Sequence, residues 1–412
     1  MSSPDSSTPA SRSLWQELGD AIRGSDADYT KISVNRAILL LAVPMILELV
    51  MESTFAIVDI YFVGKLGPSA VATVGLTETF MFLLYAIGMG LAMAVTAIVA
   101  RRIGEKRPEA AAETAVQAIL VGILVALPFS LAGLFYSREL LALMGADAWV
   151  LEEGYRYTQW MLGGNFVIVL LFIINAIFRG AGDAAIAMRV LWIANGINIL
   201  LNPMLIFGWG PLPELGVQGS AVATNIGRGV GVAVQLYSLF YSGRHLRVSL
   251  AQVAVKLDVL LNLIKTSLGG IGQMIVAMTS WIFLMRILAD IGSEAVAGTT
   301  ITIRIMMFTL MPAWGLSNAA ATLVGQNLGA GQPDRAEATV WKIGCYNMIF
   351  LIGVSFLYWF FSEELIAIFS TDAAVIAIGA EWLRILSYSY FVYGWWMVSV
   401  QAFNGAGDTR TP

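Results

Sequence analysis

The sequence predicts an all-α polytopic membrane protein built from two parallel repeats. Three observations lead to this fold class: an apolar composition, ten apolar stretches long enough to cross a bilayer, and an internal repeat. Of the 412 residues, 58% are hydrophobic and only 13% are charged, whereas charged residues make up about 25% of a soluble domain. Because too little polar surface remains to cover soluble domains, lipid must be part of the solvent.

The first element is a polar N-terminal segment, residues 1–36, which is rich in Ser, Asp and Pro and has no signal-peptide core. We expect a cytoplasmic tail, partly disordered or carrying a short interfacial helix. Apolar residues recur in it at helical spacing: Leu14, Trp15, Leu18, Ala21 and Ile22.

Ten apolar stretches follow, each near the length of about 20 residues that a helix needs to span a bilayer. Runs this long and continuously apolar form helices rather than barrel strands. They lie near 37–62, 70–98, 111–136, 155–178, 187–209, 219–241, 259–288, 295–324, 338–361 and 377–403.

The basic residues between these stretches predict the orientation, since cytoplasmic loops carry an excess of Lys and Arg. With the N-terminus inside, the outer loops hold little beyond Lys65 and Arg138. The inner segments hold Arg12, Arg23, Lys31, Arg36, Arg101, Arg102, Lys106, Arg107, Arg179, Arg244, Arg247, Lys256, Arg335 and Arg410. We therefore expect a multi-pass protein of the plasma (inner) membrane with a cytoplasmic N-terminus.

The internal repeat predicts two lobes. Gly180-Ala181-Gly182-Asp183 recurs as Gly405-Ala406-Gly407-Asp408, and the same offset of 225 positions superposes Gly67 on Gly292. An even number of helices precedes the second copy, so the copies are parallel. The expected domains are an N-terminal six-helix lobe (37–242), a cytoplasmic loop (243–258) and an incomplete C-terminal lobe of four helices (259–412). We hypothesise that the chain is a fragment of a twelve-helix protein or the product of a shortened gene.

Three acids in the first stretch are candidate functional residues, because ionisable groups at membrane depth are costly. At 100° per residue, Glu52 lies about 40° and Asp59 about 20° around the helix from Glu48, so the three share one face. They either line an ion path or are satisfied by hydrogen bonds with no transport role. Glu78 and Arg304 also lie within apolar runs, and an ion pair between them is one arrangement that spacing alone cannot test.

Amides in the fifth stretch supply further candidate ligands. Asn195, Asn198 and Asn202 share one face, and Pro203 frees a backbone carbonyl one turn earlier. Carbonyl and amide oxygens suit Na⁺, and Thr224 and Asn225 in the sixth stretch add to them. The alternative is that these groups hydrogen-bond between packed helices.

Aromatic and methionine side chains near the C-terminus predict a lipophilic cavity wall for organic cations, unless they pack as core or interfacial belt. Tyr393 and Trp396 are the main aromatic candidates, and Met306 and Met307 the main thioethers. Their neighbours are Met311, Tyr388, Tyr390, Phe391 and Trp395.

The composition excludes several classes of function. The single Cys345 cannot form an internal disulfide, and with the single His245 it cannot assemble a zinc site. No nucleophile motif appears, so we expect no enzyme and no cofactor. A net charge of −4 gives no nucleic-acid footprint.

Several phrases of the sequence resemble the multidrug and toxic compound extrusion (MATE) family. They are Pro44, Val58-Asp59-Ile60, Val63-Gly64-Lys65-Leu66-Gly67, Phe178 to Asp183, and Asn198 to Asn202-Pro203 followed by Ile206-Phe207-Gly208. The resemblance implies two six-helix lobes that rock between inward-open and outward-open states and exchange H⁺ or Na⁺ for lipophilic or cationic drugs.

The resemblance also implies roles for particular residues. Asp59 matches the family's coupling acid, with Asn198, Asn202 and Thr224 around it, so Na⁺ at Asp59, Asn198 and Asn202 is one expected metal site. Many members carry Asp at the position of Asn202, which lowers the expected Na⁺ affinity unless Glu48 or Glu52 substitutes. Another branch has acids in helices seven and ten, where this chain has Ala277 and Tyr393.

From these observations we expect a secondary active antiporter, monomeric in the bilayer, that exports small organic cations or lipophilic compounds in exchange for H⁺ or Na⁺. The alternatives are a lipid or lipid-linked oligosaccharide flippase of similar architecture and, less favoured, a membrane-embedded enzyme. A flippase would be expected to present a broad basic cavity, whereas the buried stripe here is acidic.

Overall fold

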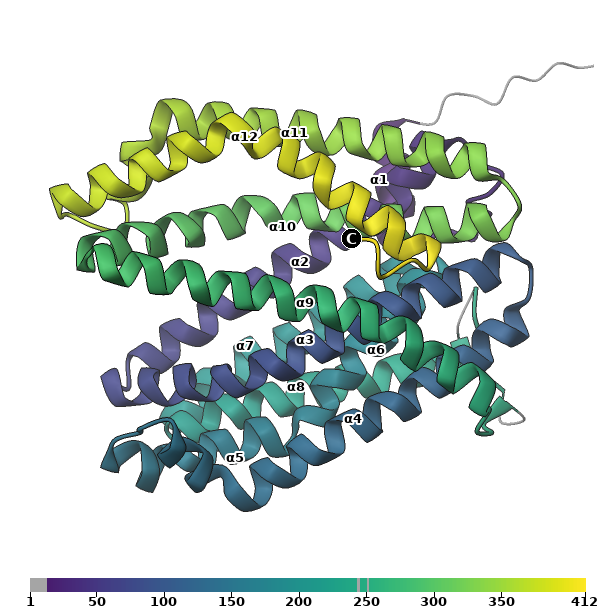
Figure 1. The fold of residues 1–412 in the computed structure, drawn as a ribbon. Helices are drawn as coiled ribbons and strands as arrows, with labels where there is room; N and C mark the ends of the chain where they lie inside the picture. The colour runs from purple at the N-terminus through teal and green to yellow at the C-terminus, as the bar shows by residue number, and fades with distance from the viewer. Residues whose placement is uncertain (1–12, 243–244, 250–251) are drawn as a thin grey trace, which may run out of the picture.

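The computed structural model describes residues 13–242, 245–249 and 252–412, and its described residues form helices and short connections without a strand (Figure 1). The first half of the chain holds α1 (Leu14–Arg23), α2 (Val34–Gly64), α3 (Pro68–Gly104), α4 (Pro108–Leu143), the π-helix η1 (Val150–Gly154), α5 (Tyr155–Gly163), α6 (Asn165–Ala181), α7 (Ala184–Phe207), α8 (Val217–Tyr237) and the π-helix η2 (Ser238–Ser242). The second half holds α9 (Leu257–Ile291), α10 (Ser293–Gly329), α11 (Pro333–Ala367) and α12 (Ala373–Ala406).

Each of the ten predicted stretches falls on helix, and the all-α membrane fold class is confirmed. Within the described residues, nine helical spans are long and apolar enough to cross a membrane, one fewer than the sequence count. The difference is α8, a helix of 21 residues that carries Ser220, Thr224, Asn225 and Arg228. It packs against α5, α6 and α7, so neighbouring helices accommodate its polar side chains.

From residue 13 on, the N-terminal segment holds a short helix, α1, which is one of the two alternatives expected from the sequence. Ser13 and Gln16 form a reciprocal capping box at the start of α1, whereas Leu14 and Trp15 are largely exposed. Residues 1–12 lie outside the described part of the chain, as do 243–244 and 250–251 within the predicted loop between the lobes.

The repeat in the sequence recurs in the backbone. α4 and α11 leave helical geometry at Tyr136 (φ −127°, ψ 20°) and Phe361 (φ −121°, ψ 23°), 225 positions apart. α6 and α12 both end on a left-handed glycine, Gly182 (φ 91°) and Gly407 (φ 88°). Glycine adopts this conformation without steric cost, so the repeated Gly-Ala-Gly-Asp phrase stops a helix in the same way in both copies.

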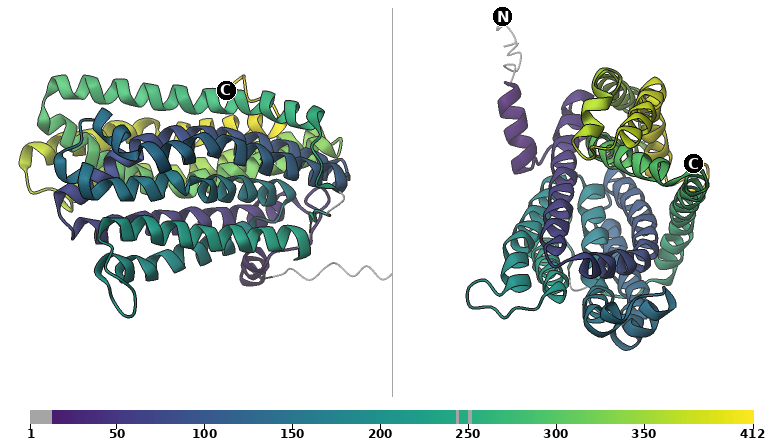
Figure 2. Two further views of the ribbon diagram at one scale, coloured as in Figure 1. Left: turned by 90° about the horizontal axis from the view of Figure 1, so that it is seen from below. Right: turned by 90° about the vertical axis from the view of Figure 1, so that its left-hand side faces the viewer.

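The first helix of each repeat packs on the second helix of the other repeat. α2 lies against α10, and α9 lies against α3. Figure 2 shows α9 beside α3 and α4, and its contact with α12 is confined to a few residues such as Gln273 and Asn404. The N-terminal helices (α2–α8) and the C-terminal helices (α9–α12) are therefore joined by an exchange of their first members.

Close contacts between the two groups of helices also occur in pairs that are related by the offset of 225 positions. Gly104 lies on the backbone of Gln326, and Gly329 lies on the backbone of Arg101, which is the same pair with the repeats exchanged. A contact that is reciprocal in this way is the signature of a two-fold axis. At these glycines, a side chain would overlap the facing backbone, so they allow the groups to meet closely at the end of the bundle where α3 and α10 terminate.

Candidate functional site

A cavity of about 400 Å³ lies between the N-terminal helices and α10 and α12, which is within the usual size range of small-molecule sites. Its charged lining consists of Glu48, Glu52, Glu78, Arg179 and Arg228. Its aromatic and thioether lining consists of Phe55, Tyr85, Met89, Met93, Phe172, Met311 and Trp314. Most of these residues come from α2, α3 and α6, so the acid-bearing face of α2 borders the cavity.

Glu48 is 4% exposed and bound to α6. Its Oε1 accepts hydrogen bonds from Asn175 Nδ2 at 3.2 Å and from Arg179 Nη1 at 3.3 Å. Arg179, predicted for an inner loop, instead lies in the last turn of α6. Arg179 therefore neutralises the charge of this acid. Glu48 Oε2 is buried without a hydrogen-bond partner, so this oxygen can still accept one.

Glu52 is paired with α8 and α7. Its Oε1 lies 2.6 Å from Arg228 Nη2, and its Oε2 accepts a hydrogen bond from Asn195 Nδ2 at 3.0 Å. The side chain of Arg228 is 7% exposed and its guanidinium lies 5.2 Å from the ring centroid of Phe55. Both carboxylate oxygens of Glu52 are therefore occupied.

Asp59 differs from the two glutamates because both of its donors are neutral. Its Oδ1 accepts hydrogen bonds from Ser220 Oγ at 2.6 Å and from Asn202 Nδ2 at 2.7 Å. None of the described residues donates to its Oδ2 or forms an ion pair with it. Asp59 is thus the acid of α2 whose charge has no direct cationic partner.

Amide oxygens lie next to this acid. Asn198 Nδ2 donates to Thr224 Oγ1 at 2.9 Å, and the Oδ1 atoms of Asn198 and Asn202 are buried without a hydrogen-bond partner. A carboxylate with neutral oxygen ligands suits a hard cation such as Na⁺. In the described part of the chain, no three His, Cys, Asp or Glu side chains cluster as a metal site, so any such ion would depend on these amide and hydroxyl oxygens.

A second cavity, of about 670 Å³, lies between α9, α10 and α12. Tyr393 and Trp396 line it, and so does Ala277. Met306 instead packs with the core of the C-terminal helices, and Met307 is exposed; neither lines the two cavities described here. No acid lines this second cavity, so the C-terminal helices supply aromatic surface without a carboxylate.

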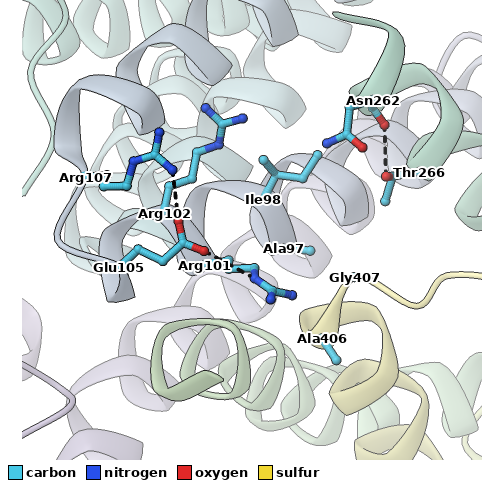
Figure 3. A pocket seen from close by; sticks show the side chains of 10 residues that line it. All are labelled: Ala97, Ile98, Arg101, Arg102, Glu105, Arg107, Asn262, Thr266, Ala406 and Gly407. Carbon is cyan, nitrogen blue, oxygen red and sulfur yellow. Dashed lines mark hydrogen bonds and ion pairs between the residues drawn. The ribbon is translucent and has the colours of Figure 1, made fainter. Parts of the chain in front are cut away.

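A third cavity lies near the end of α3, where Arg101, Arg102 and Arg107 gather (Figure 3). Glu105 forms ion pairs with Arg101 at 3.4 Å and with Arg107 at 3.6 Å. Arg102 donates to the carbonyl oxygen of Ala110 at 2.8 Å. These arginines therefore have partners within the end of α3 and the start of α4.

Sequence reasoning missed several partners of the acids. Ser220 lies four residues before Thr224 on α8, so helical periodicity alone places it on the same face. Asn175 and Arg179 have no such signal, because only the packing of α6 on α2 brings them to Glu48. The suggested pair of Glu78 and Arg304 is absent among the described residues: Glu78 lines the first cavity and Arg304 is exposed.

The fold and the cavity define a class of protein: a polytopic helical membrane protein whose pseudo-symmetric helix groups enclose a charged and aromatic cavity. A model of the MatE family matches residues 44–204 and 270–412. The chain therefore belongs to the MATE family of membrane transporters, which are not enzymes.

Relatives with assigned names cover most of the chain. It is 25% identical over 379 residues to the probable multidrug resistance protein NorM of Thermotoga maritima, spanning 92% of this chain and 82% of that protein. It is 26% identical to the FAD transporter of Shewanella oneidensis, with 90% and 82% covered. It is 24% identical to the multidrug export protein MepA of Staphylococcus aureus, with 89% and 80% covered.

Solved structures share the fold. A MATE transporter in complex with MaL6 superposes with a TM-score of 0.84 at 24% identity, covering 95% of this chain and 85% of that one. A transporter from Pyrococcus furiosus, described as having a binding pocket of reversed polarity, superposes with a TM-score of 0.83 at 25% identity, with the same coverage.

Proposed function

We propose that this transporter is a secondary active antiporter that exports lipophilic or cationic organic compounds in exchange for H⁺ or Na⁺. The observation that carries the proposal is Asp59: an acid on a helix that borders the cavity, held by neutral donors, with one oxygen unbonded. The names of the NorM and MepA relatives support multidrug export.

In this proposal the ion site consists of Asp59 with Asn198, Asn202 and Thr224. Ion entry neutralises the uncompensated charge of Asp59. This changes which packing of α2 against α7 and α10 has the lower free energy. Since Glu52 lies on the same face of α2 and lines the cavity, a movement of this helix alters the cavity wall. The ion and the substrate need only differ in their affinity for the two states.

Glu48 and Glu52 have a different part in the proposal. Each is paired with an arginine that also lines the cavity, so neither acid alone carries a net charge to exchange. They keep the guanidinium groups from giving the cavity a positive potential. We place the chain in the plasma membrane as a monomer with its N-terminus in the cytoplasm, in keeping with the distribution of Lys and Arg.

The charges of the cavity also bear on the alternative of a lipid or lipid-linked oligosaccharide flippase. A flippase needs a basic surface for phosphate groups, but the cavity has three glutamates against two arginines. The FAD transporter of Shewanella oneidensis is nevertheless a relative named for an anionic cargo, so export of anions is the outcome to test against.

The test uses the full chain in proteoliposomes loaded with rhodamine 6G, a fluorescent cation. Imposed pH and Na⁺ gradients are collapsed separately, by a protonophore and by a sodium ionophore. We expect one of the two treatments to stop transport and Asp59→Asn to lower the coupled rate at least about tenfold, which corresponds to 1.4 kcal/mol. Glu139→Gln, an exposed acid on α4, is the matched control. Native-rate coupled transport by Asp59→Asn would show that the ion does not act at this acid.

A further inference from the structure

Glu78 on α3 is the cavity acid that the arginines leave unpaired. It shares one face of α3 with Tyr85, Met89 and Met93, which line the same cavity. None of the described residues forms a hydrogen bond or an ion pair with its carboxylate, whereas Glu48 and Glu52 have Arg179 and Arg228. With those two pairs cancelled, the remaining charge of the cavity is the negative charge of Glu78.

Aromatic rings surround the cavity that this carboxylate enters. Tyr85 and Phe172 meet edge to face, with centroids 5.9 Å apart, and Phe55 and Trp314 line the same space. A cation is attracted to aromatic faces and to a carboxylate that it does not have to share. Arg228 already lies over Phe55, so the ring that it covers is less available to a ligand than the others.

We propose that Glu78 is the specificity-determining residue that receives the positive group of a monocationic aromatic substrate. This rests on the proposed export function and deepens it, since it assigns the charge selection to an acid outside the ion site of Asp59. A dication or an anion gains less binding free energy per charge from the cavity than a monocation does, because Glu78 is the one cavity charge that no arginine cancels.

The test measures binding to the purified full chain by fluorescence polarisation, with rhodamine 6G as the monocation and Nile red as the neutral probe. In Glu78→Gln, we expect the Kd for rhodamine 6G to rise about tenfold and the Kd for Nile red to stay the same. Glu139→Gln makes the same chemical change on an exposed face of α4 and should leave both Kd values unchanged.

The outcomes separate the two proposals. If the native chain binds rhodamine 6G and Glu78→Gln binds it equally well, or loses both probes equally, the role of Glu78 is overturned while export of cations stands. If the native chain neither binds nor transports the cation, the proposed function itself fails, and the assignment of Glu78 fails with it.

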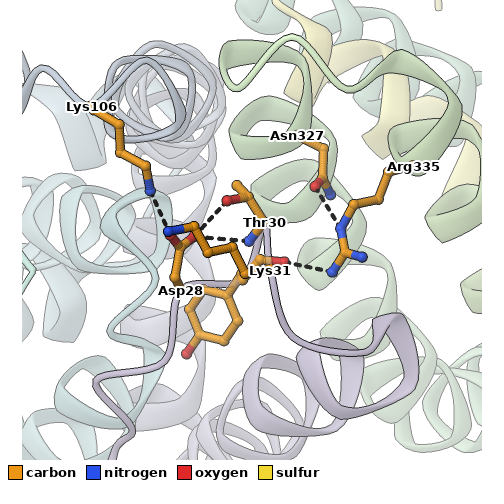
Figure 4. Close-up of polar contacts among 7 residues, drawn as sticks. Asp28, Thr30, Lys31, Lys106, Asn327 and Arg335 are labelled. Atoms are coloured by element: carbon orange, nitrogen blue, oxygen red, sulfur yellow. Dashed lines mark hydrogen bonds and ion pairs between the residues drawn. The ribbon is translucent and has the colours of Figure 1, made fainter.

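An independent observation concerns the segments that lead into the first helix of each repeat. Residues 28–35, the first lead segment, run from the chain before α2 into its first turn, and they bond to α11: Arg335 Nη2 donates to the carbonyl oxygen of Tyr29 at 2.9 Å, and Lys342 Nζ donates to Asn35 Oδ1 at 3.0 Å. Figure 4 shows Arg335 and Asn327 on one side of this segment and Lys106 on the other.

The same segment also binds the N-terminal helices. Asp28 Oδ2 lies 2.7 Å from Lys106 Nζ, and the Tyr29 hydroxyl donates to the carbonyl oxygen of Gly182 at 2.9 Å. Partial burial favours the neutral acid, but hydrogen bonds from Lys106 and Thr30 outweigh it and lower the pKa of Asp28 to about 2. The contact is therefore charged throughout the physiological pH range.

Residues 254–256, the second lead segment, behave in the reciprocal way. They precede α9 yet bond to α4, where Gln117 Nε2 donates to the carbonyl oxygen of Ala254 at 2.6 Å and Glu113 pairs with Lys256 at 2.6 Å. Gln117 and Lys342 are equivalent positions of the repeat. Each lead segment thus reaches across to the other group of helices, as α2 and α9 do.

The two lead segments differ in what they fill. Tyr29 packs against Gly182 and Gln326, whose repeat equivalents are Gly407 and Arg101. The space beside Gly407 and Arg101 is the open third cavity of about 370 Å³ (Figure 3). The first lead segment is therefore a wedge between α6 and α10, and among the described residues it has no counterpart in the other half.

We infer that the first lead segment is a latch that holds the two groups of helices together at this end and must be released before the cavity can open there. The experiment is hydrogen exchange of the full chain in lipid nanodiscs. Arg335→Ala should speed exchange about tenfold both at residues 28–33 and at 100–106 with 326–332, where the groups meet. Arg384→Ala makes the same chemical change at an exposed arginine of α12, whose ion pair with Glu363 lies outside the segment, and it should change neither region.

Lys342→Gln is a second variant, which removes the charged group that donates to Asn35, and it should give the same pattern with a smaller change. Faster exchange confined to residues 28–33 in both variants would overturn the latch, because the segment would then loosen without separating the groups.

Discussion

The ion pair of Glu52 and Arg228 offers the sharpest test of the site's energetics. Arg228→Met removes a guanidinium that is 7% exposed and leaves a carboxylate, 31% exposed, without its cation at 2.6 Å. Breaking a buried pair in this way costs about 3–5 kcal/mol. Because Asn195 still donates to Glu52, we expect the lower value, about 3 kcal/mol.

The assay is thermal unfolding of the purified chain in detergent, followed by the loss of the monodisperse peak in size-exclusion chromatography. For a chain of this length, each kcal/mol shifts the Tm by about 1–2 °C, an extension of the trend for smaller domains. Arg228→Met should therefore lower the Tm by about 3–6 °C. The double variant with Glu52→Gln should regain most of the loss, because it leaves no uncompensated charge.

A matched control exists on the surface. Arg384 and Glu363 are 2.8 Å apart but 44% and 62% exposed, and exposed pairs contribute about 0–1 kcal/mol. Arg384→Met should change the Tm by less than about 2 °C. The reasoning is refuted if Arg228→Met is as mild as this control, or if the double variant is as unstable as the single one.

Three further predictions concern the ends of helices and the ion site. Gly182→Ala should destabilise the chain by about 1–2 kcal/mol more in thermal unfolding than Gly407→Ala, because both have positive φ but the first also faces a tyrosine ring and the second faces open space. The contribution of Asp28, whose pKa is lowered to about 2, should be fully present above pH 4 and lost only as the pH falls through about 2, so hydrogen exchange at residues 28–33 should not change between pH 5.5 and 8 beyond the intrinsic rate. Asn202→Asp should place a second carboxylate beside Asp59 and lower the Na⁺ concentration for half-maximal export about tenfold in proteoliposomes; an unchanged Na⁺ dependence would argue against Na⁺ at this site.

The sequence predicted the helices, the repeat and the shared face of the acids, because these depend on local periodicity. Hydropathy locates a span from its own residues, and a spacing of four or seven places two side chains on one face of a helix. The repeat in particular predicted geometry in detail, since Gly182 and Gly407 end their helices alike. Only α8 was misjudged in apolarity, because its polar residues Ser220, Thr224 and Arg228 are buried against other helices.

The arginines that pair with Glu48 and Glu52 could not be predicted from the sequence. Arg179 lies 131 positions from Glu48 and Arg228 lies 176 positions from Glu52, and a single chain has no local signal that joins residues so far apart. The exchange of α2 and α9 between the repeats was missed for the same reason. Met306 and Met307 were assigned to a cavity wall by composition; Met306 packs with the core of the C-terminal helices and Met307 is exposed, so neither lines the two cavities described above.

The long separation of these partners has a consequence for biosynthesis. The helix bearing Glu48, Glu52 and Asp59 leaves the ribosome early, yet the groups that satisfy its acids emerge only after α6, α7 and α8 have been made. The neighbour that covers its remaining side, α10, comes later still. The nascent first span must therefore be sheltered at the insertion machinery, or enter lipid with its carboxyls protonated, until more than half of the polypeptide has joined it.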